Sequence, residues 1–464
     1  MANEKRASWS GSLAFVLAAS ASAVGLGNLW RFPYLAAKYG GGVFIAVYLI
    51  LSLTLGFTLL VTEIALGRYS RQSQLTAFRQ LGHPRWNFLG VLSTIVPLFI
   101  LPYYNVIGGW VVRYFVAYVK IMSGGGGLEN PQEFFNSFIA APWDPFVCML
   151  VFTVVTCAVI IVGVKHGIEK ANLVMMPVLL LMACGLAVYV ATLPGSGAGI
   201  RFYLVPDFST CDNIGKVVLG AMGQMFYSLS LAMGIMITYG SYMRRCDSVP
   251  KASVRIVAAD TFVAVLSGFM IIPVVVMFAA ASGDGRAAID AGPGLMFVTL
   301  PKVFASLGTA GLWIGFLFFV LVLFAALTSA ISMTEACVAA VCDFFRIGRV
   351  ASVAAVCMWS LALGAVSAFG YGRWADFKPF GLPALEFFDA SMNTLTPIVA
   401  ALICVFAGWV LRPKRILAEC RRDGSGVGFK FFYVVMVKFV APVLVLAILI
   451  SEICRMFGIG GWAI

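Results

Sequence analysis

Six polar residues stand deep inside long apolar runs of this 464-residue sequence, and their side chains are those best placed to bind a ligand there. They are Asn28, Ser228, Asp260, Thr328, Ser329 and Glu335. A polar or charged group in the middle of a membrane is unfavourable, so such residues commonly mark the path of an ion or substrate. Two structural alternatives stay open. A hydroxyl group can bond back to its own helix, and Asp260 can serve a structural hydrogen bond or an interhelical ion pair.

Small and polar residues interrupt two of the apolar runs near their middle. Residues 20–28 read SASAVGLGN, and residues 227–234 read YSLSLAMG. Glycine and serine are poor helix formers, so we expect a helix to break at both places. Unwound backbone would free carbonyl oxygens for a cation and amide groups for a carboxylate. The alternative is that the small residues only let helices pack closely.

The elements that must position these residues are membrane-spanning helices. The chain is 61% hydrophobic and only 11% charged, which is too little charge for the surface of a soluble protein. The apolar runs are long enough for helices to cross a bilayer and lack the alternation of a barrel strand. We therefore predict an all-α polytopic membrane protein with about 11 transmembrane helices. The expected spans are residues 12–38, 42–68, 88–121, 145–164, 170–193, 213–242, 253–281, 303–340, 350–370, 384–411 and 429–456.

The two interrupted runs are the first and sixth of these spans. Paired interruptions at corresponding positions predict a 5+5 inverted repeat with broken helices 1 and 6 and a binding site near the middle of the membrane. Repeat one would cover about residues 10–193, repeat two about 213–411, and an extra helix 429–456. No linker is long enough to divide the chain, so residues 1–464 form one transmembrane domain. The loop segments 121–144 and 194–212 are expected to form short surface helices or flaps over the outer face.

The loop charges predict the orientation. Most of the 32 Lys and Arg residues fall in every second loop, in the set that includes the N-terminal segment. Because positively charged loops stay inside, the N-terminus is expected in the cytoplasm, and an odd number of spans places the C-terminus outside. The expected location is the inner (plasma) membrane. The net charge of +12 thus indicates topology, and no nucleic-acid partner is expected.

Four short runs carry a resemblance to a known family. They are residues 24–34 (VGLGNLWRFPY), 63–68 (EIALGR), 224–230 (QMFYSLS) and 324–330 (FAALTSA). With these four runs the chain resembles the neurotransmitter:sodium symporter family. Within that family it resembles the bacterial amino-acid transporters of the multi-hydrophobic subgroup. The runs lie in both halves in the family order, so the resemblance covers nearly the whole chain.

The resemblance implies two sodium sites and no organic cofactor. The first sodium would be bound by the residues Ala23, Asn28, Ser228 and Asp260, with the substrate carboxylate completing the shell. The second would be bound by Ala21, Val24, Ala325, Thr328 and Ser329. Oxygen-only ligation suits a hard cation.

The same resemblance implies a substrate pocket. The substrate carboxylate would meet the amides near Leu26 and Gly27 and the hydroxyl of Tyr104. The complete expected lining is Ala23, Leu26, Gly27, Ile100, Tyr104, Tyr227, Ser230, Met233, Ser329 and Met333. Without the resemblance, Tyr104 would be interpreted as an aromatic packing residue.

The resemblance also implies two gates. The inner gate would pair Arg6 with Asp343, supported by Trp9 and Tyr242. Glu335 occupies a position nearby where the family has glutamine. The outer gate needs Arg31 and an acid in the tenth span. The expected acid position is Met392 here, with Asp389 three residues before it and Asn393 directly after.

Chloride-dependent relatives bind the anion beside the first sodium. The matching positions here include Tyr48, Gln224 and Ser228, but Asp260 replaces a family asparagine and Ala264 replaces a serine or acid. Asp260 would then supply the negative charge, and a second anion beside it would be repelled. The resemblance therefore implies transport without chloride.

The resemblance implies a sodium-coupled symporter that imports neutral, hydrophobic L-amino acids by alternating access. A membrane enzyme is disfavoured because the two histidines, His83 and His166, lie in loops without a companion acid or cysteine cluster. A channel or a non-transporting amino-acid sensor stays open as an alternative. The expected partners are the amino acid, sodium and the lipid bilayer; the oligomeric state is not predicted.

Overall fold

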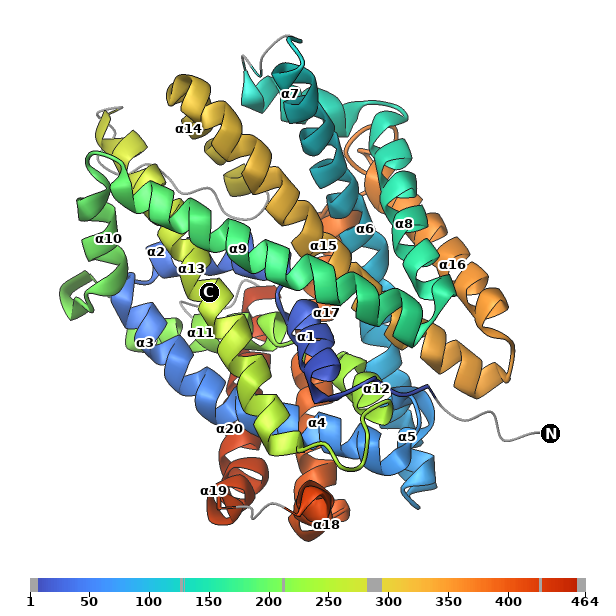
Figure 1. Ribbon diagram of the computed structural model, residues 1–464. Helices are drawn as coiled ribbons and strands as arrows, with labels where there is room; N and C mark the ends of the chain where they lie inside the picture. Colours follow the sequence, from blue (N-terminus) through green and yellow to red (C-terminus); the bar gives the residue numbers. More distant parts are fainter. Residues whose placement is uncertain are drawn as a thin grey trace.

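The computed structural model describes residues 7–125, 128, 130–210, 213–281, 294–424 and 428–456. Over these residues the chain folds into helices, and its single β-type contact is an isolated bridge between Gly41 and Pro206. Figure 1 shows the helices packed side by side, with α7 (Pro131–Ala140) at one end of the molecule and α5 (Gln74–Gln80) and α18 (Pro413–Cys420) at the other. The expected all-α fold is confirmed.

The first span is broken. Helix α1 (Ser12–Ala23) ends where Val24 adopts an extended conformation, and the chain resumes as a π-helical turn, Gly27–Arg31, that continues into α2 (Phe32–Lys38). The two parts are bent by 54° relative to each other. The break thus falls in the Gly- and Ser-rich run where the sequence predicted it.

The sixth span is broken as well. Helix α11 (Ile214–Ser228) stops, and α12 (Ile235–Ser241) begins after six intervening residues. In between, Ser230, Ala232 and Gly234 take positive φ angles of 52°, 62° and 69°. This left-handed conformation is unfavourable for Ser and Ala, so the surrounding structure must hold the unwound segment in place.

The remaining spans are continuous or nearly so. They are α3–α4 (Gly42–Leu51 and Phe57–Ser70, joined by Ser52–Gly56), α6 (Asn87–Met122), α8 (Asp144–Val162), α9 (Lys170–Thr192), α13 (Val249–Ala281), α15 (Gly308–Phe345), α16 (Arg349–Phe369), α17 (Ala384–Val405) and α19–α20 (Lys430–Val435 and Ala441–Met456, joined by Met436–Val440). Among the described residues, nine helical segments are long and apolar enough to span a bilayer, and the bent first span makes a tenth. The remaining expected span, the sixth (213–242), is divided between α11 and α12, each too short to count alone.

One expected boundary is wrong. The sequence predicted a single span over 303–340, but α14 (Leu300–Ser306) is a separate helix and α15 begins only at Gly308. Gly308 has a φ of +62°, a conformation that turns the chain between the two helices. The expected surface helices are present in the loop segments as α7 and α10 (Ser196–Leu204).

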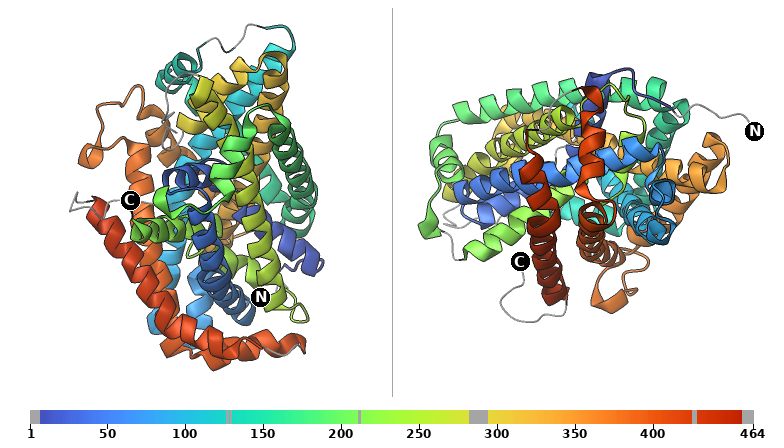
Figure 2. Two further views of the ribbon diagram at one scale, coloured as in Figure 1. Left: turned by 90° about the vertical axis from the view of Figure 1, so that its left-hand side faces the viewer. Right: turned by 90° about the horizontal axis from the view of Figure 1, so that it is seen from below.

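The broken helices lie inside the bundle and the long spans surround them. Helix α1 packs against α13, α15 and α9, while α6 packs against α15, α8, α16 and α17. Figure 2 shows the last helix, α20, along one side of the molecule, where it packs on α17. This arrangement places both breaks, far apart in sequence, next to each other in the interior.

Candidate functional site

The two breaks enclose a cavity. All ten residues expected to line the substrate pocket line this one cavity, which has a volume of about 370 Å³ including space that opens to solvent. Ser22, Gly25, Asn28 and Ser228 complete the lining. Since these residues come from α1, α6, α11, the unwound segment and α15, the cavity exists only in the folded bundle.

One polar group in this cavity lacks a protein partner. The hydroxyl group of Tyr104 is buried and accepts or donates no hydrogen bond among the described residues. A Cβ atom added at Gly25 would lie 2.5 Å from Ser329 Oγ and 3.4 Å from the Tyr104 hydroxyl oxygen. Glycine therefore keeps the space beside this hydroxyl open, as a site for a polar ligand group requires.

Asp260 lies at the centre of a hydrogen-bonded cluster beside the cavity. Its carboxylate accepts from Asn28 Nδ2 (2.8 Å), from the Ser228 hydroxyl (2.7 Å) and from the Tyr48 hydroxyl (3.1 Å). Asn28 Oδ1 in turn accepts from the Gly25 amide (3.1 Å), which fixes the backbone at the first break. All these side chains are buried, so the cluster concentrates oxygen atoms in a dry place where a hard cation would be coordinated.

The chloride-related positions adjoin this cluster. Gln224 donates from Nε2 to the carbonyl oxygen of Gly27 (3.1 Å), while its Oε1 has no hydrogen-bond partner among the described residues. Ala264 is fully buried on α13, the helix that also carries Asp260.

A second group of oxygens forms where α1 meets α15. Ser329 Oγ donates toward the carbonyl oxygens of Ser22 (3.2 Å) and Val24 (3.4 Å). Thr328 Oγ1 donates to the carbonyl oxygens of Phe324 and Ala325, both at 3.0 Å. Ala21 is buried on α1, the helix that also carries Ser22.

Sequence reasoning missed Ser22. Its carbonyl oxygen accepts from Ser329 and also from Ser230 Oγ (3.1 Å), so it links α1, α15 and the unwound segment. The sequence shows Ser22 only as a small residue in a broken run. Backbone carbonyl groups carry no sequence signal, and only the fold shows which ones face a cavity.

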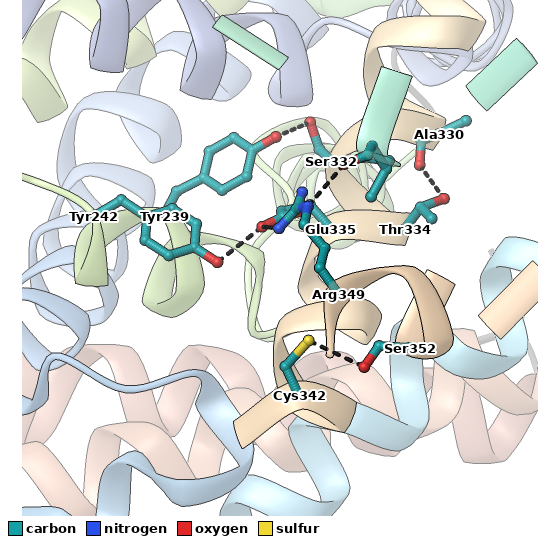
Figure 3. Close-up of polar contacts among 10 residues, drawn as sticks. Tyr239, Tyr242, Ala330, Ser332, Thr334, Glu335, Cys342, Arg349 and Ser352 are labelled. Carbon is teal, nitrogen blue, oxygen red and sulfur yellow. Dashed lines mark hydrogen bonds and ion pairs between the residues drawn. The ribbon is translucent and has the colours of Figure 1, made fainter. Parts of the chain in front are cut away.

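Below the cavity, Glu335 forms what we term the inner network, made of Tyr242, Glu335 and Arg349 (Figure 3). Glu335 is fully buried. Its carboxylate accepts from Arg349 Nη2 (2.6 Å) and Nη1 (3.2 Å) and from the Tyr242 hydroxyl (2.8 Å). Arg349 also donates to the carbonyl oxygen of Ile160 (2.8 Å), which ties α16 to α8.

Arg349 was expected only as a loop charge. Glu335, fourteen residues earlier in the sequence, could have indicated a buried partner such as Arg349, because a buried acid on α15 needs a nearby cation. Of the expected inner ion pair, Asp343 accepts from the Ser73 amide (2.7 Å), and Arg6 lies outside the described residues. Trp9, close by, donates to the carbonyl oxygen of Tyr239 (3.1 Å).

Above the cavity, the arginine of the expected outer gate makes what we term the outer contact. The guanidinium carbon of Arg31 lies 5.5 Å from the centre of the Tyr227 ring. Met392 is buried on α17. Asp389, one turn before it, accepts from the Tyr103 hydroxyl (3.0 Å) and from Asn393 Nδ2 (2.9 Å).

A polar cavity enclosed by two broken spans of a multi-pass membrane protein is the arrangement of a secondary transporter. The comparisons with known proteins agree with this class. The family model described as "Sodium:neurotransmitter symporter family" matches residues 6–122 and 135–460. The chain belongs to this family, as its sequence motifs indicated.

Its relatives are similar over their full length. The chain is 34% identical over 98% of its length to the uncharacterized sodium-dependent transporter YhdH of Bacillus subtilis, of which it covers 99%. It is 31% identical, over 97% of its length, to an uncharacterized sodium-dependent transporter of Haemophilus influenzae, of which it covers 99%. These proteins are transporters, which confirms the expectation that the chain is not an enzyme.

A solved structure has the same fold. The crystal structure of MhsT in complex with L-phenylalanine superposes with a TM-score of 0.85, at 33% sequence identity, covering 96% of this chain and 100% of that one. The chain is therefore a multi-pass membrane protein of a sodium-dependent transporter family.

Proposed function

We propose that this protein imports neutral, hydrophobic L-amino acids together with sodium, by alternating access and without a need for chloride. The observation that carries the proposal is the cavity between the two breaks, whose lining combines a free tyrosine hydroxyl at one side with apolar side chains at the other. MhsT, similar in fold and sequence, is known in complex with L-phenylalanine, which supports a substrate of this class.

The substrate carboxylate binds at the polar side. The hydroxyl of Tyr104 donates to it, together with the amides near Leu26 and Gly27 at the start of the helical turn after the first break. A helix N-terminus favours a negative charge. Gly25 supports this assignment because any side chain there would collide with Ser329 and crowd Tyr104.

The substrate side chain binds at the apolar side. Ile100, Met233 and Met333 line it, and methionine adapts its shape to different apolar partners. Among the described residues that line the cavity there is no Lys, Arg, Asp or Glu. We expect leucine, methionine and aromatic amino acids to compete with one another, and aspartate and lysine not to compete.

Two sodium ions drive the transport. The first binds to the Ala23 carbonyl, Asn28, Ser228 and Asp260, and the substrate carboxylate completes its shell. The second binds between α1 and α15, to carbonyl groups of Ala21, Val24 and Ala325 and hydroxyls of Thr328 and Ser329. The buried oxygens at both places support these assignments.

Chloride is not required because Asp260 supplies the negative charge beside the first sodium. Replacement of the family's chloride-site serine or acid by Ala264 removes a ligand for the anion. An anion next to the Asp260 carboxylate would be repelled strongly in a dry interior.

The topology follows from the same proposal. The chain lies in the plasma membrane with the N-terminus in the cytoplasm and the C-terminus outside, and its two halves, residues 10–193 and 213–411, form the inverted repeat. Arg6 and Asp343 then close the cytoplasmic end together with the inner network, and Arg31 closes the external end.

The test is uptake by the purified full-length protein in proteoliposomes with an imposed sodium gradient. Radiolabelled L-leucine should accumulate only with sodium outside, and accumulation should persist when gluconate replaces chloride. Unlabelled phenylalanine and methionine should compete, whereas aspartate and lysine should not. Strict dependence on chloride would contradict the role of Asp260, and uptake of a decarboxylated amine in place of amino acids would contradict the carboxylate site.

The matched variants are Gly25→Ala and Gly223→Ala. Both are glycine-to-alanine changes near the cavity, but a Cβ at Gly223 meets only Arg31 Nη2, at 3.8 Å. Gly25→Ala should weaken leucine binding clearly, and Gly223→Ala should not. Equal effects of the two would mean that the space at Gly25 does not hold substrate.

A further inference from the structure

The last span carries a lysine that forms no ion pair. Lys438 belongs to the π-helical turn Met436–Val440, within the apolar span Lys430–Cys454. None of the ion pairs between described residues includes it. A lysine in a membrane-spanning helix is unfavourable unless its ammonium group reaches a partner, water or the lipid headgroups. The surroundings of this ammonium group therefore show which partner it can take.

The ammonium group lies over a tryptophan at the end of the neighbouring span. Lys438 Nζ is 4.9 Å from the centre of the Trp409 ring. The ring of Phe439 meets the same indole edge-on, with 5.9 Å between the ring centres. Trp409 belongs to a second π-helical turn, Phe406–Val410, where the span Ala384–Val410 ends. Trp409 and Phe439 are 56% and 55% exposed, so the site faces the lipid.

The two turns pack closely enough to form one site. A Cβ atom added at Gly408 would lie 3.2 Å from the Val437 carbonyl oxygen and 3.3 Å from Lys438 Cγ, so a glycine is needed for this approach. One turn earlier in the last span, the Tyr433 hydroxyl shares a hydrogen bond of 2.8 Å with Thr62 Oγ1, which holds the span against α4. Lys438 and Trp409 are thus held in place relative to each other.

The surface next to this site is basic. Helix α18 begins four residues after Trp409, and Figure 1 shows it end-on, so it runs across the direction of the long spans. Its apolar side chains Ile416 and Leu417 are buried, while Lys414 and Arg415 are exposed. Basic residues directly beside the end of a span attract anionic lipid headgroups.

We propose that Lys438 and Trp409 bind the phosphate group of an anionic phospholipid, in the leaflet that contacts α18. The ammonium group of Lys438 donates to the phosphate oxygens, and the rings of Trp409 and Phe439 lie along the glycerol and the upper acyl chains, where aromatic residues are favoured. A zwitterionic phospholipid carries its own cation beside the phosphate, so an anionic one is preferred. The inference depends neither on the transported substrate nor on the direction of transport.

The experiment measures lipid binding to the purified full-length protein by native mass spectrometry. The protein in detergent is titrated with phosphatidylglycerol, or with phosphatidylcholine that has the same acyl chains, and the dissociation constant of the first bound lipid is determined. Phosphatidylglycerol should bind more tightly. Lys438→Gln should weaken its binding about fivefold, the effect of one basic residue at an anionic membrane surface, and should leave phosphatidylcholine binding unchanged. Lys438→Arg should retain the preference, because it keeps the cation.

Two matched variants separate this site from the rest of the surface. Lys414→Gln removes a nearby exposed charge from α18, and Trp313→Leu removes a tryptophan from α15 that is 54% exposed. Both should bind phosphatidylglycerol as the unchanged chain does. Trp409→Leu should bind it more weakly, because the ammonium group loses the ring that positions it.

Equal losses in Lys438→Gln and Lys414→Gln would mean that only the overall positive surface attracts the lipid, and the inference would be wrong. Unchanged binding in Lys438→Gln or in Trp409→Leu would also overturn it. If Lys438→Gln does not fold, as judged by thermal unfolding in phosphatidylcholine, Trp409→Leu decides alone. Displacement of phosphatidylglycerol by an equal concentration of glycerol 3-phosphate would assign the site to a soluble phosphate and contradict the lipid assignment.

Discussion

The inner network and the outer contact lie at the two ends of the cavity and are built in different ways. In the inner network, one fully buried carboxylate accepts three directed hydrogen bonds from Arg349 and Tyr242. In the outer contact, Arg31 lies over the face of Tyr227 at 5.5 Å. The first arrangement depends on atomic positions, whereas a cation over an aromatic face tolerates displacement.

This difference indicates which end contributes more to the stability of the conformation described here. Bidentate charged hydrogen bonds in a dry site are lost as a unit when one partner moves away. We therefore expect substitutions in the inner network to shift the molecule far more than substitutions in the outer contact. The four predictions below test that order, from the largest effect to the smallest.

Arg349→Ala should have the largest effect. It leaves the Glu335 carboxylate buried without its cation, which destabilises a protein by roughly 3 kcal/mol, somewhat reduced here because Arg349 is 28% exposed. Thermal unfolding of the purified protein in detergent with sodium should move down by several degrees. Labelling of the native Cys342, which bonds to Ser352 beside the network, should become faster.

The control for this variant is Arg346→Ala. Arg346 lies in the short connection between α15 and α16, three residues before Arg349, and is exposed, so its removal should change neither stability nor the labelling of Cys342. The exposed Cys246 serves as the reference for reagent activity. Similar behaviour of the two arginine variants would show that the inner network does not hold this end closed.

The double variant Glu335→Gln with Arg349→Gln should be less harmful than Arg349→Ala. Both charges disappear, so no uncompensated buried carboxylate remains, and the loss should be about 1 kcal/mol. The comparison uses thermal unfolding of the single and double variants under one set of conditions. A double variant less stable than Arg349→Ala would contradict the account of the network as a compensated pair.

Tyr242→Phe removes one hydrogen bond from Glu335 and keeps the ion pair. The expected loss is about 1 kcal/mol, a typical net value for a single hydrogen bond, because the carboxylate keeps its two bonds to Arg349. The ring contact with Trp9, whose centroid lies 6.1 Å away, should persist. Tyr239→Phe is a suitable comparison, since Tyr239 bonds to the neutral Ser332 (2.9 Å) and should cost less.

Arg31→Lys should have the smallest effect on stability. It keeps the positive charge but loses the flat guanidinium group over Tyr227, a contact that contributes about 0.5–1 kcal/mol. Tyr227→Phe keeps an aromatic face and should be milder still in the same unfolding measurement. A loss for Arg31→Lys as large as that for Arg349→Ala would remove the contrast between the two ends.

Much of the fold could be predicted from the sequence. Long apolar runs form helices because unpaired backbone groups are not tolerated in a bilayer. The helices break at residues 20–28 and 227–234 because Gly and Ser are poor helix formers. The sequence erred at 303–340 because α14 and α15 are both apolar, and hydropathy alone does not reveal the turn at Gly308. The residues of the cavity were predicted through family motifs, and the structure brings all ten together.

The sequence by itself determined which segments are helical, where two of them break, and which polar residues stand in apolar surroundings. Only the tertiary structure decided their partners: Arg349 for Glu335, the Ser22 carbonyl for Ser230 and Ser329, and the Trp409 ring for Lys438. The physical reason is that hydropathy and helix propensity act along the chain over a few residues. Contacts across the bundle depend on how helices hundreds of residues apart pack and rotate against one another, and backbone carbonyl groups, which are the same in every residue, acquire a role only from that packing.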